Sequence, residues 1–321
     1  IEANIPDLGA RAVRYVDDMI IGLEDHETAE AVLSKISLAL YDYELEFNGT
    51  KTQVYGLGKS HKPEWRHFVR GFRISSRPTR QREDIDSFFE QAVQLADANP
   101  QDNVLSYAAR RSASFFVLPE NRNHLFRWMI YLSRREPSCL SMLVEHSSSE
   151  SKNGRTVPTN GIANFIRKRL PKESESGHTA EVAWLLFWAR ELEIQIDARL
   201  LQEVTKLRSS VCALIVLDLR QRGLVSGAID DSFWSGFANK EGLGSELWLL
   251  SYEATKKGWW ARTKSTGFIS GHPHFGLLLS EDVSFYDENQ RARPQEGGEF
   301  FSMVARTARG MPDQTYAEDY R

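Results

Sequence analysis

Hydrophobic and polar residues alternate near the start of the chain and recur at helical spacing through most of the rest. Residues 12–23 follow a period-two pattern rich in Val, Ile and Tyr, which is typical of half-buried β-strands. Asp17 and Asp18 interrupt this apolar run at its centre. The pattern predicts a β-hairpin that carries the two carboxylates at its tip.

An amphipathic helix is predicted directly after this hairpin. Asp25 is a candidate N-cap, and apolar side chains recur every three or four residues over positions 29–43. Asn48 and Gly49 then form a turn signal between two short extended runs within residues 44–54. Strand, helix and strand are therefore expected to form one small sheet with a helix lying on it.

A second small hairpin is predicted over residues 65–74. The centre of this stretch, Phe68–Phe72, places aromatic residues on both sides of Gly71. Glycine has no Cβ and allows another backbone to approach closely, which suits the tip of a strand. The two hairpins and the helix between them form the β-containing part of the predicted fold.

Helical periodicity takes over from about residue 81. Apolar stripes of helical length, separated by short polar connections, predict about ten helices. The predicted segments are 85–96, 103–114, 120–134, 138–146, 161–169, 179–192, 197–207, 210–222, 230–238 and 245–257. No fixed sequence repeat is present, so the pattern fits either an irregular HEAT-like solenoid of antiparallel helix pairs or an irregular helical bundle.

The predicted fold class is α+β, with three successive parts. Residues 1–79 form the β-containing part and residues 80–288 form the mainly α-helical, repeat-like domain. Residues 289–321 contain Gly-Gly, Arg-Pro and Met-Pro steps and little periodicity. This tail is expected to be loosely ordered.

Composition places the chain among globular proteins. Its 321 residues are 41% hydrophobic and 26% charged, with a net charge of −4 that argues against a simple nucleic-acid coat. No apolar run approaches the ~20 residues needed to cross a bilayer, and no signal peptide precedes the first strand, so we expect a cytoplasmic protein without a membrane partner. Cys139 and Cys212 lack the spacing of a disulfide framework or a zinc site.

The adjacent carboxylates are the strongest chemical signal in the sequence. Asp17 and Asp18 repel each other, and both are costly in a site removed from water unless a cation lies between them. Because no cysteine or histidine cluster is present, the metal would be held by oxygen ligands, which suit Mg²⁺. For the pair taken alone, a solvated acidic turn is the alternative.

The string Tyr-Val-Asp-Asp at residues 15–18 resembles the YxDD box in the palm of reverse transcriptases. The resemblance implies that Asp17 and Asp18 are catalytic metal ligands, with Asp17 the direct one, and that Tyr15 lies at the nucleotide and primer site. Two Mg²⁺ ions catalyse the transfer of dNTPs in such polymerases. The implied activity is RNA-directed DNA polymerisation, with an RNA template, a DNA product and dNTPs as partners.

A downstream string extends this resemblance. Leu45, Asn48, Lys51 and Thr52 are similar to the Leu-x-Asn-x-x-Lys-Thr-like string that follows the YxDD hairpin in the same family. The match implies that Lys51 acts at the phosphates of the incoming nucleotide, where an ammonium can neutralise or protonate the pyrophosphate leaving group. A solvated lysine after a turn is the alternative for an isolated Lys.

The hairpin predicted over residues 65–74 resembles the primer-grip element of the family. This resemblance implies that Gly71 and Phe72 help to hold the 3′ end of the primer beside the carboxylates. An ordinary sheet edge is the alternative. The polymerase-like match covers residues 1 to about 75.

The long helical part most resembles the bacterial abortive-infection (Abi) and related defence-associated reverse transcriptases, whose palm leads into a helical-repeat domain. The resemblance implies a role in anti-phage defence. The family also uses an aspartate on an earlier palm strand and basic finger residues, which this sequence lacks. The chain is therefore expected to be the C-terminal part of a longer polypeptide and to be inactive as a polymerase alone. A homo-oligomer is compatible with this layout.

A non-catalytic helical scaffold that binds RNA or protein through a concave face is the alternative function. Basic clusters along the helical part could line such a face or simply complement helix C-termini. The clusters are Arg110–Arg111, Arg134–Arg135, Arg167–Arg169 with Lys172, and Arg220 with Arg222. Trp184, Trp188 and Trp248 are expected in the core, whereas Trp259 and Trp260 could be core residues or base-stacking platforms.

Overall fold

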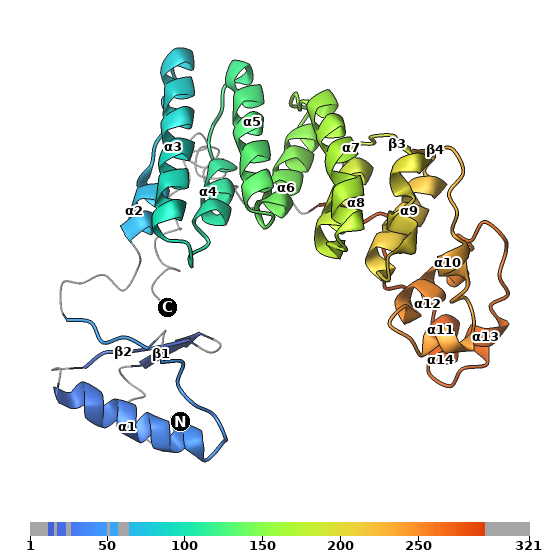
Figure 1. Cartoon of the computed structure of the whole chain (residues 1–321), viewed down its shortest axis with the longest axis horizontal. Helices are drawn as coiled ribbons and strands as arrows, with labels where there is room; N and C mark the ends of the chain where they lie inside the picture. Colours follow the sequence, from blue (N-terminus) through green and yellow to red (C-terminus); the bar gives the residue numbers. More distant parts are fainter. Residues whose placement is uncertain (1–11, 16–17, 24–26, 50–51, 57–63, 293–321) are drawn as a thin grey trace, which may run out of the picture. The chain divides into compact units, whose positions relative to one another are not determined.

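The protein is mainly helical, with one small antiparallel sheet near its start (Figure 1). The computed structural model describes residues 12–15, 18–23, 27–49, 52–56 and 64–292. The chain divides into two compact units, residues 1–67 and 68–321. The expected mainly helical α+β class is confirmed.

The first unit contains the predicted hairpin. Strand β1 (Ala12–Tyr15) pairs antiparallel with strand β2 (Asp18–Ile21). Helix α1 (Glu27–Tyr41) follows, and its Ile36 side chain is buried. Ile21, Val32, Leu40 and Phe47 pack around Ile36. The hairpin and the helix are confirmed, while the candidate N-cap Asp25 lies outside the described residues.

No strand follows α1 in residues 42–49 and 52–56, which are the described part of this stretch. The N–H and the Oγ1 of Thr52 both donate to the carbonyl oxygen of Asn48 at 3.0 Å, which closes a turn at the predicted place. Leu45, in the run before the turn, is 58% exposed. The strands predicted around the turn are wrong for these residues, because short runs without a neighbouring sheet do not hold strand geometry.

The hairpin predicted over residues 65–74 is also wrong, because Glu64–Gly71 form helix α2. The rings of Phe68 and Phe72 meet edge to face at 5.4 Å, and Phe72 contacts Phe88 at 5.1 Å. A spacing of four residues satisfies both strand alternation and a helical stripe, so the pattern alone was ambiguous. The segment is helical because both rings then pack on Phe88 of the following helix.

The second unit is a succession of packed helices. Its longer helices are α3 (Pro78–Ala98), α4 (Val104–Ser112), α5 (Pro119–Arg135), α6 (Cys139–Lys152), α7 (Thr159–Glu175), α8 (Thr179–Glu191), α9 (Ser210–Gln221) and α12 (Trp248–Lys256). Helix α3 contacts α4 and α5, α6 contacts α8, and α9 contacts both α8 and α12. The unit starts earlier than the expected boundary at residue 80, because Phe68 packs on Phe88 of α3.

Residues 197–207 are predicted as one helix but form two 3₁₀ turns. The short elements are β3 (Ile196–Asp197), η2 (Ala198–Leu201), η3 (Val204–Lys206), β4 (Val225–Ser226), α10 (Ser232–Ser235), α11 (Lys240–Leu243), α13 (Gly267–Ser270) and α14 (Phe275–Ser280). Ile196 pairs in parallel with Val225, and the Asp197 carboxylate accepts the N–H of Arg199 at 2.9 Å. These two contacts hold the chain extended where a helix was expected to begin.

Several of the longer helices end in the same way. A glycine with positive φ follows α6, α7, α9 and α12, at Gly154, Gly177, Gly223 and Gly258. The next N–H then bonds a carbonyl of the last turn, as in Arg155 to Glu150 at 2.9 Å. This is the Schellman arrangement, which favours glycine because the left-handed conformation is strained with a Cβ. It brings the residue after each glycine back toward the last turn.

The predicted tail begins with an ordered segment. The N–H of Ala292 donates to Glu191 at 3.0 Å, and Ala292 itself is buried. Loose order is therefore wrong for residues 289–292, because their backbone is bonded to the ends of helices. Residues 293–321 lie outside the described residues.

Two expectations from composition can be compared with the structure. Cys139 and Cys212 are both free and buried, as expected for a chain without a disulfide framework. Within the ranges described, none of the helices combines the length and the apolar composition that crossing a membrane requires.

Trp188 occupies the centre of the second unit. The side chain is fully buried, and its Nε1–H donates to the Oγ of Ser147 in α6 at 2.7 Å. Trp259 and Trp260 are 8% and 5% exposed, so burial leaves them unavailable as stacking platforms. The hydroxyl of Ser148, beside Ser147 in sequence, is also buried and has no hydrogen-bond partner among the described residues.

We predict opposite results for two adjacent serine substitutions in α6. Ser147→Ala leaves the buried indole N–H of Trp188 unpaired and should lower the free energy of unfolding by about 1–3 kcal/mol. Ser148→Ala removes a buried hydroxyl that lacks a partner and should be neutral or stabilising. Urea unfolding of both variants and the wild type measures the difference. Equal losses in the two variants would contradict the assigned hydrogen bond.

Candidate functional site

The predicted polymerase residues belong to the hairpin of the first unit. In the ladder between β1 and β2, Tyr15 lies opposite Asp18. Asp17 and Lys51 lie outside the described residues, and so do the side chains of Tyr15 and Asp18. The hairpin that carries the acidic pair is confirmed, and the metal-binding and nucleotide-binding roles of its residues stay predictions.

One face of this hairpin is apolar and exposed. Val13 and Ile20 lie opposite each other and are 70% and 55% exposed. Further large exposed apolar side chains of the same unit are Leu38, Tyr41, Tyr43 and Leu45. A two-stranded sheet is marginal by itself in water, and clustered exposed apolar side chains mark interaction surfaces. The first unit therefore presents a surface suited to packing against further structure.

Gly71 and Phe72 lie in a helical context. Gly71 is the last residue of α2, and a Cβ added there would meet no atom within 4 Å. The carbonyl oxygen of Phe72 accepts a hydrogen bond from Nη2 of Arg111 at 3.3 Å. The hairpin tip on which the primer-grip interpretation rests is therefore absent here, and no close backbone approach requires a glycine.

A second set of candidates lies at the C-terminal ends of helices in the second unit. Five helices carry a buried carboxylate in their last turn: Glu150 in α6, Glu173 in α7, Glu191 in α8, Asp218 in α9 and Glu253 in α12. The helix dipole disfavours negative charge at this end, and burial raises the cost. Each carboxylate therefore needs a cation or hydrogen-bond donors nearby. The basic clusters predicted from the sequence include two of their partners, Arg169 and Arg222, whereas the carboxylates themselves were not predicted.

Glu150 and Glu173 are paired by the residue that follows the Schellman glycine. Arg155 Nη1 lies 2.5 Å from Glu150 Oε1, and His178 Nδ1 lies 2.7 Å from Glu173 Oε2. Because the turn brings this residue back toward the last turn, the same backbone geometry supplies a partner at both helix ends. Arg122 of α5 approaches Glu150 from a neighbouring helix at 3.7 Å.

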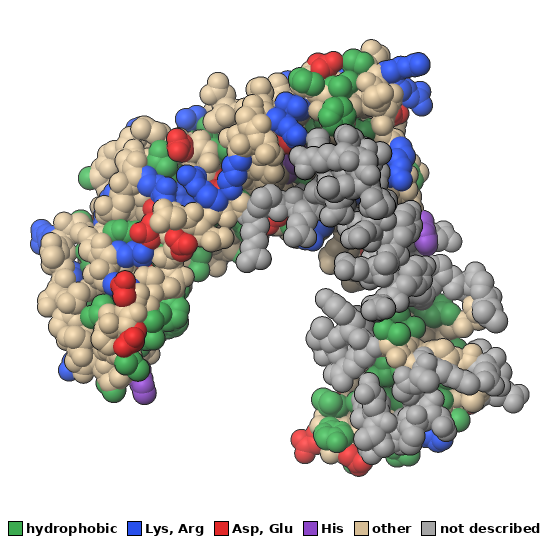
Figure 2. Space-filling view, turned by 180° about the vertical axis from the view of Figure 1, so that it is seen from behind, with side chains coloured by type: hydrophobic (Ala, Val, Ile, Leu, Met, Phe, Trp, Pro, Cys, Tyr) green, Lys and Arg blue, Asp and Glu red, His purple; other side chains and the backbone are tan. Residues whose placement is uncertain are grey.

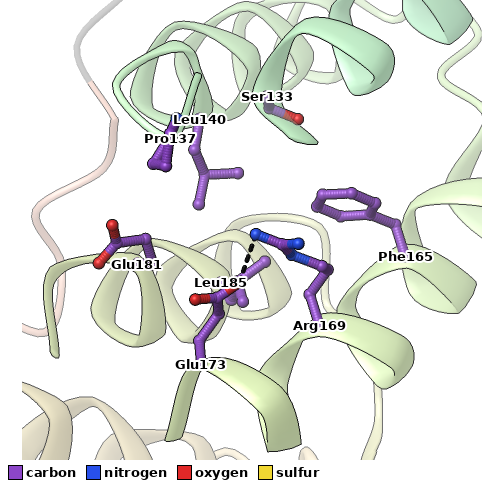
Figure 3. Close-up of a pocket in the computed structure, with 8 residues that line it drawn as sticks. All are labelled: Ser133, Pro137, Leu140, Phe165, Arg169, Glu173, Glu181 and Leu185. Atoms are coloured by element: carbon purple, nitrogen blue, oxygen red, sulfur yellow. Dashed lines mark ion pairs between the residues drawn. The ribbon is translucent and has the colours of Figure 1, made fainter. Parts of the chain in front are cut away.

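The Glu173 site also borders a small cavity between helices (Figure 3). Arg169, one turn earlier in α7, points toward Glu173 and forms an ion pair with it. The cavity measures about 10 Å³, which is about the space of one water molecule. Small-molecule sites need roughly 300 Å³ or more. The arrangement is therefore a packing contact between helices and not a substrate pocket.

An open apolar groove of about 370 Å³ lies near α12 and α14. Leu243, Trp248, Phe275 and Phe285 contribute to its lining. None of the described residues that line the groove is charged, so this lining offers apolar contact.

Most of the predicted basic clusters are engaged within the protein. Arg134 lies over Phe165, Arg135 pairs with Asp97, Arg169 with Glu173, Arg220 with Asp231 and Arg222 with Asp218. Figure 2 shows Lys and Arg side chains gathered on one face, with Asp and Glu side chains close to them. These pairs reduce the positive charge available to a phosphate backbone. Arg110, Lys168 and Lys172 are exposed.

Metal-binding geometry is not found in the described part of the chain. There, no three His, Cys, Asp or Glu side chains are grouped so that they could hold an ion. Since Asp17 lies outside that part, the Mg²⁺ prediction for the hairpin stays untested.

No family model, curated protein or solved structure matches the chain. Inference about function therefore depends on the Tyr-Val-Asp-Asp string and on the geometry of the described residues.

His146 adds a titratable group beside the Glu150 site. It lies one turn before Glu150 in α6, is buried, and contacts the ring of Phe126 at 5.4 Å. Burial lowers the pKa of His146 to about 4, with Glu150 opposing and Arg155 reinforcing this shift. The imidazole is therefore neutral in the folded protein at neutral pH.

We predict that His146 makes the second unit less stable as the pH falls. The unfolded chain takes up the proton near pH 6.5, whereas the folded protein resists it down to about pH 4. The contribution of neutral His146 to the free energy of unfolding is complete above pH 6.5. It is lost progressively as the pH falls toward 4, by roughly 3 kcal/mol in total. Urea unfolding across this pH range measures the loss.

The variant His146→Gln should flatten this pH dependence, because the titrating group is gone. His274→Gln serves as the control, since His274 is exposed. It should retain the slope of the wild type. If all three proteins lose stability equally between neutral pH and pH 4, His146 does not drive the transition.

Proposed function

We propose that this chain carries the C-terminal part of the palm of an RNA-directed DNA polymerase of the anti-phage defence type. The observation that carries the proposal is an antiparallel hairpin, packed on a helix, whose sequence reads Tyr-Val-Asp-Asp at the turn. The reaction is transfer of a dNTP to a primer hydroxyl with two Mg²⁺ ions. The hairpin is the part of the palm that brings acidic ligands to these ions.

Each residue of the motif has a distinct role in this proposal. Asp17 is a direct ligand of the catalytic Mg²⁺, and the Asp18 carboxylate adds a second negative charge near the ion. Lys51 acts at the phosphates of the incoming dNTP, where it stabilises the pyrophosphate leaving group. Tyr15 lies at the nucleotide and primer site.

The exposed apolar face of the hairpin supports this proposal. Val13 and Ile20 are more than half exposed although both lie in strands. In a polymerase palm the hairpin is one part of a larger sheet with its own core, which would cover such side chains. A solvated acidic turn at the surface of a finished domain would not need this apolar pair.

A non-catalytic scaffold is the second candidate function. It is favoured by the second unit, whose packed helices have a large core of their own, including Phe88, Trp188 and Tyr252. Stacked helix pairs offer extended surfaces for RNA or protein. The two candidates differ in their dependence on Asp17, because a scaffold does not need that carboxylate.

We predict that Asp17→Asn lowers dNTP incorporation by at least ~10³-fold, on the order of 4 kcal/mol in the barrier. Asparagine keeps the shape of the side chain but removes the charge that holds Mg²⁺. The assay is Mg²⁺-dependent dNTP incorporation by the protein of the complete reading frame that encodes this chain. Stability should be unchanged or slightly higher, because the acidic pair no longer repels itself.

Asp42→Asn is the matched control, because Asp42 is exposed just after α1. This variant should incorporate dNTPs like the wild type. Near-normal incorporation by Asp17→Asn would exclude the role of Asp17 as a metal ligand and with it the argument from the Tyr-Val-Asp-Asp string. Retained RNA binding in every variant, with no incorporation by the wild type, would favour the scaffold.

A further inference from the structure

After α14 the chain returns across the ends of four earlier helices. Residues 282–292, here called the strap, contain no helix or strand. Along its length the strap contacts α12, then α9, α8 and finally α6. It therefore connects helices that lie far apart in the sequence.

The helices recognise the strap mainly through its backbone. At the start of the strap, Tyr252 Oη and Lys256 Nζ donate to the carbonyl oxygen of Val283 at 2.8 Å. The N–H of Phe285 donates to the Glu253 carboxylate at 2.5 Å. Further along, the carbonyl oxygens of Glu288, Gln290 and Ala292 accept hydrogen bonds from Arg222, Arg190 and Lys152 respectively, the last at 2.8 Å. Most of the donors and acceptors on the helix side belong to the last turns or to residues directly after them. The helix ends thus present a row of donors and acceptors to an extended segment.

Tyr286 is the side chain that fixes the position of the strap. Its hydroxyl donates to Asp218 Oδ2 at 2.9 Å and accepts from Arg190 Nη1 at 3.1 Å. Its ring meets that of Trp259 edge to face at 5.6 Å. Burial and the neighbouring Asp218 raise the pKa of Tyr286, so the hydroxyl keeps its proton. Two residues later, Glu288 pairs with Lys257 at 2.5 Å.

The strap also completes the environment of carboxylates that helix ends disfavour. The side chains of Glu191 and Glu253 are 0% exposed, and that of Asp218 is 3% exposed. Negative charge in the last turn of a helix interacts unfavourably with the helix dipole, so these carboxylates do not stabilise the helices that carry them. Backbone N–H groups of the strap, from Phe285 and Ala292, donate to two of them. The strap therefore adds donors to carboxylates that cations such as Arg190 and Arg222 also approach.

We propose that residues 282–292 are an intramolecular peptide ligand of the second unit. The strap binds through its backbone to the ends of α6, α8, α9 and α12 and holds these helices in one arrangement. Because hydrogen bonds and a few ring contacts are spread along an extended segment without secondary structure, the strap opens as one cooperative unit while the helices stay folded.

The test uses the full chain with Tyr286→Phe and Glu288→Gln combined, which removes one hydroxyl and one charge from the strap. Tyr41→Phe with Glu281→Gln is the matched control, because Tyr41 is 80% exposed and Glu281 is also exposed. Amide hydrogen exchange at Phe285 and Ala292 is the readout, since neither residue is mutated and both N–H groups bond helix-end carboxylates.

In the strap variant, exchange at both amides should rise together by about tenfold or more, whereas the control should match the wild type. Trypsin cleavage after Arg291 should accelerate by a similar factor. Exchange in the middle of α8 and α9, which the strap contacts, should not change, and this would show that the helices remain folded.

Two results would overturn the proposal. Unchanged exchange at Ala292 in the strap variant would mean that the segment does not open as one unit. If dilution of the wild-type protein lowers the protection of both amides from hydrogen exchange, the segment binds the helix ends of a second copy of the chain.

Discussion

Compensation of buried carboxylates at helix C-terminal ends is the constraint on which the second unit depends. Removing one partner of a buried ion pair costs about 3–5 kcal/mol, a large part of the stability of an ordinary domain. Glu150 and Glu173 are paired by residues brought back by the glycine turns. Glu191, Asp218 and Glu253 lie where the strap crosses. Local turns therefore supply partners at the earlier helix ends, whereas the later ones combine nearby cations, such as Arg222 beside Asp218, with donors from the strap.

The first unit depends on a different kind of interaction. Among its described residues few apolar side chains are buried, with Ile36 at the centre of a small cluster between the hairpin and α1. Leu38 and Tyr41 of the same helix are 70% and 80% exposed. So little burial gives a small net stabilisation once conformational entropy is subtracted. Additional structure packed against this unit would bury these side chains, and under the proposed function that structure is the rest of the polymerase palm.

Local pattern was enough to predict the hairpin, α1 and most of the long helices, because their side-chain periodicity reflects one buried face. It failed at Phe68 and Phe72, whose spacing of four fits a strand or a helix until Phe88 is placed beside them. It also failed for residues 289–292, which lack apolar periodicity and are ordered by bonds such as Ala292 to Glu191. Contacts between residues so distant in sequence leave no local signal. For the acidic pair, the string at residues 15–18 indicates chemistry, while the positions of Asp17 and Lys51 lie outside what the structure describes.

Many of the basic residues form ion pairs with carboxylates of the same chain, and this limits the surfaces that could bind nucleic acid. Phosphate binding draws its energy from cations that are free to replace counterions. Arg220 and Arg222 instead neutralise Asp231 and Asp218, so a bound phosphate backbone would have to compete with buried or half-buried carboxylates. That competition leaves these arginines to a structural role. Under the proposed function, a template would have to be held by exposed cations such as Lys168 and Lys172 or by the hairpin unit, and not by the helix ends that bind the strap.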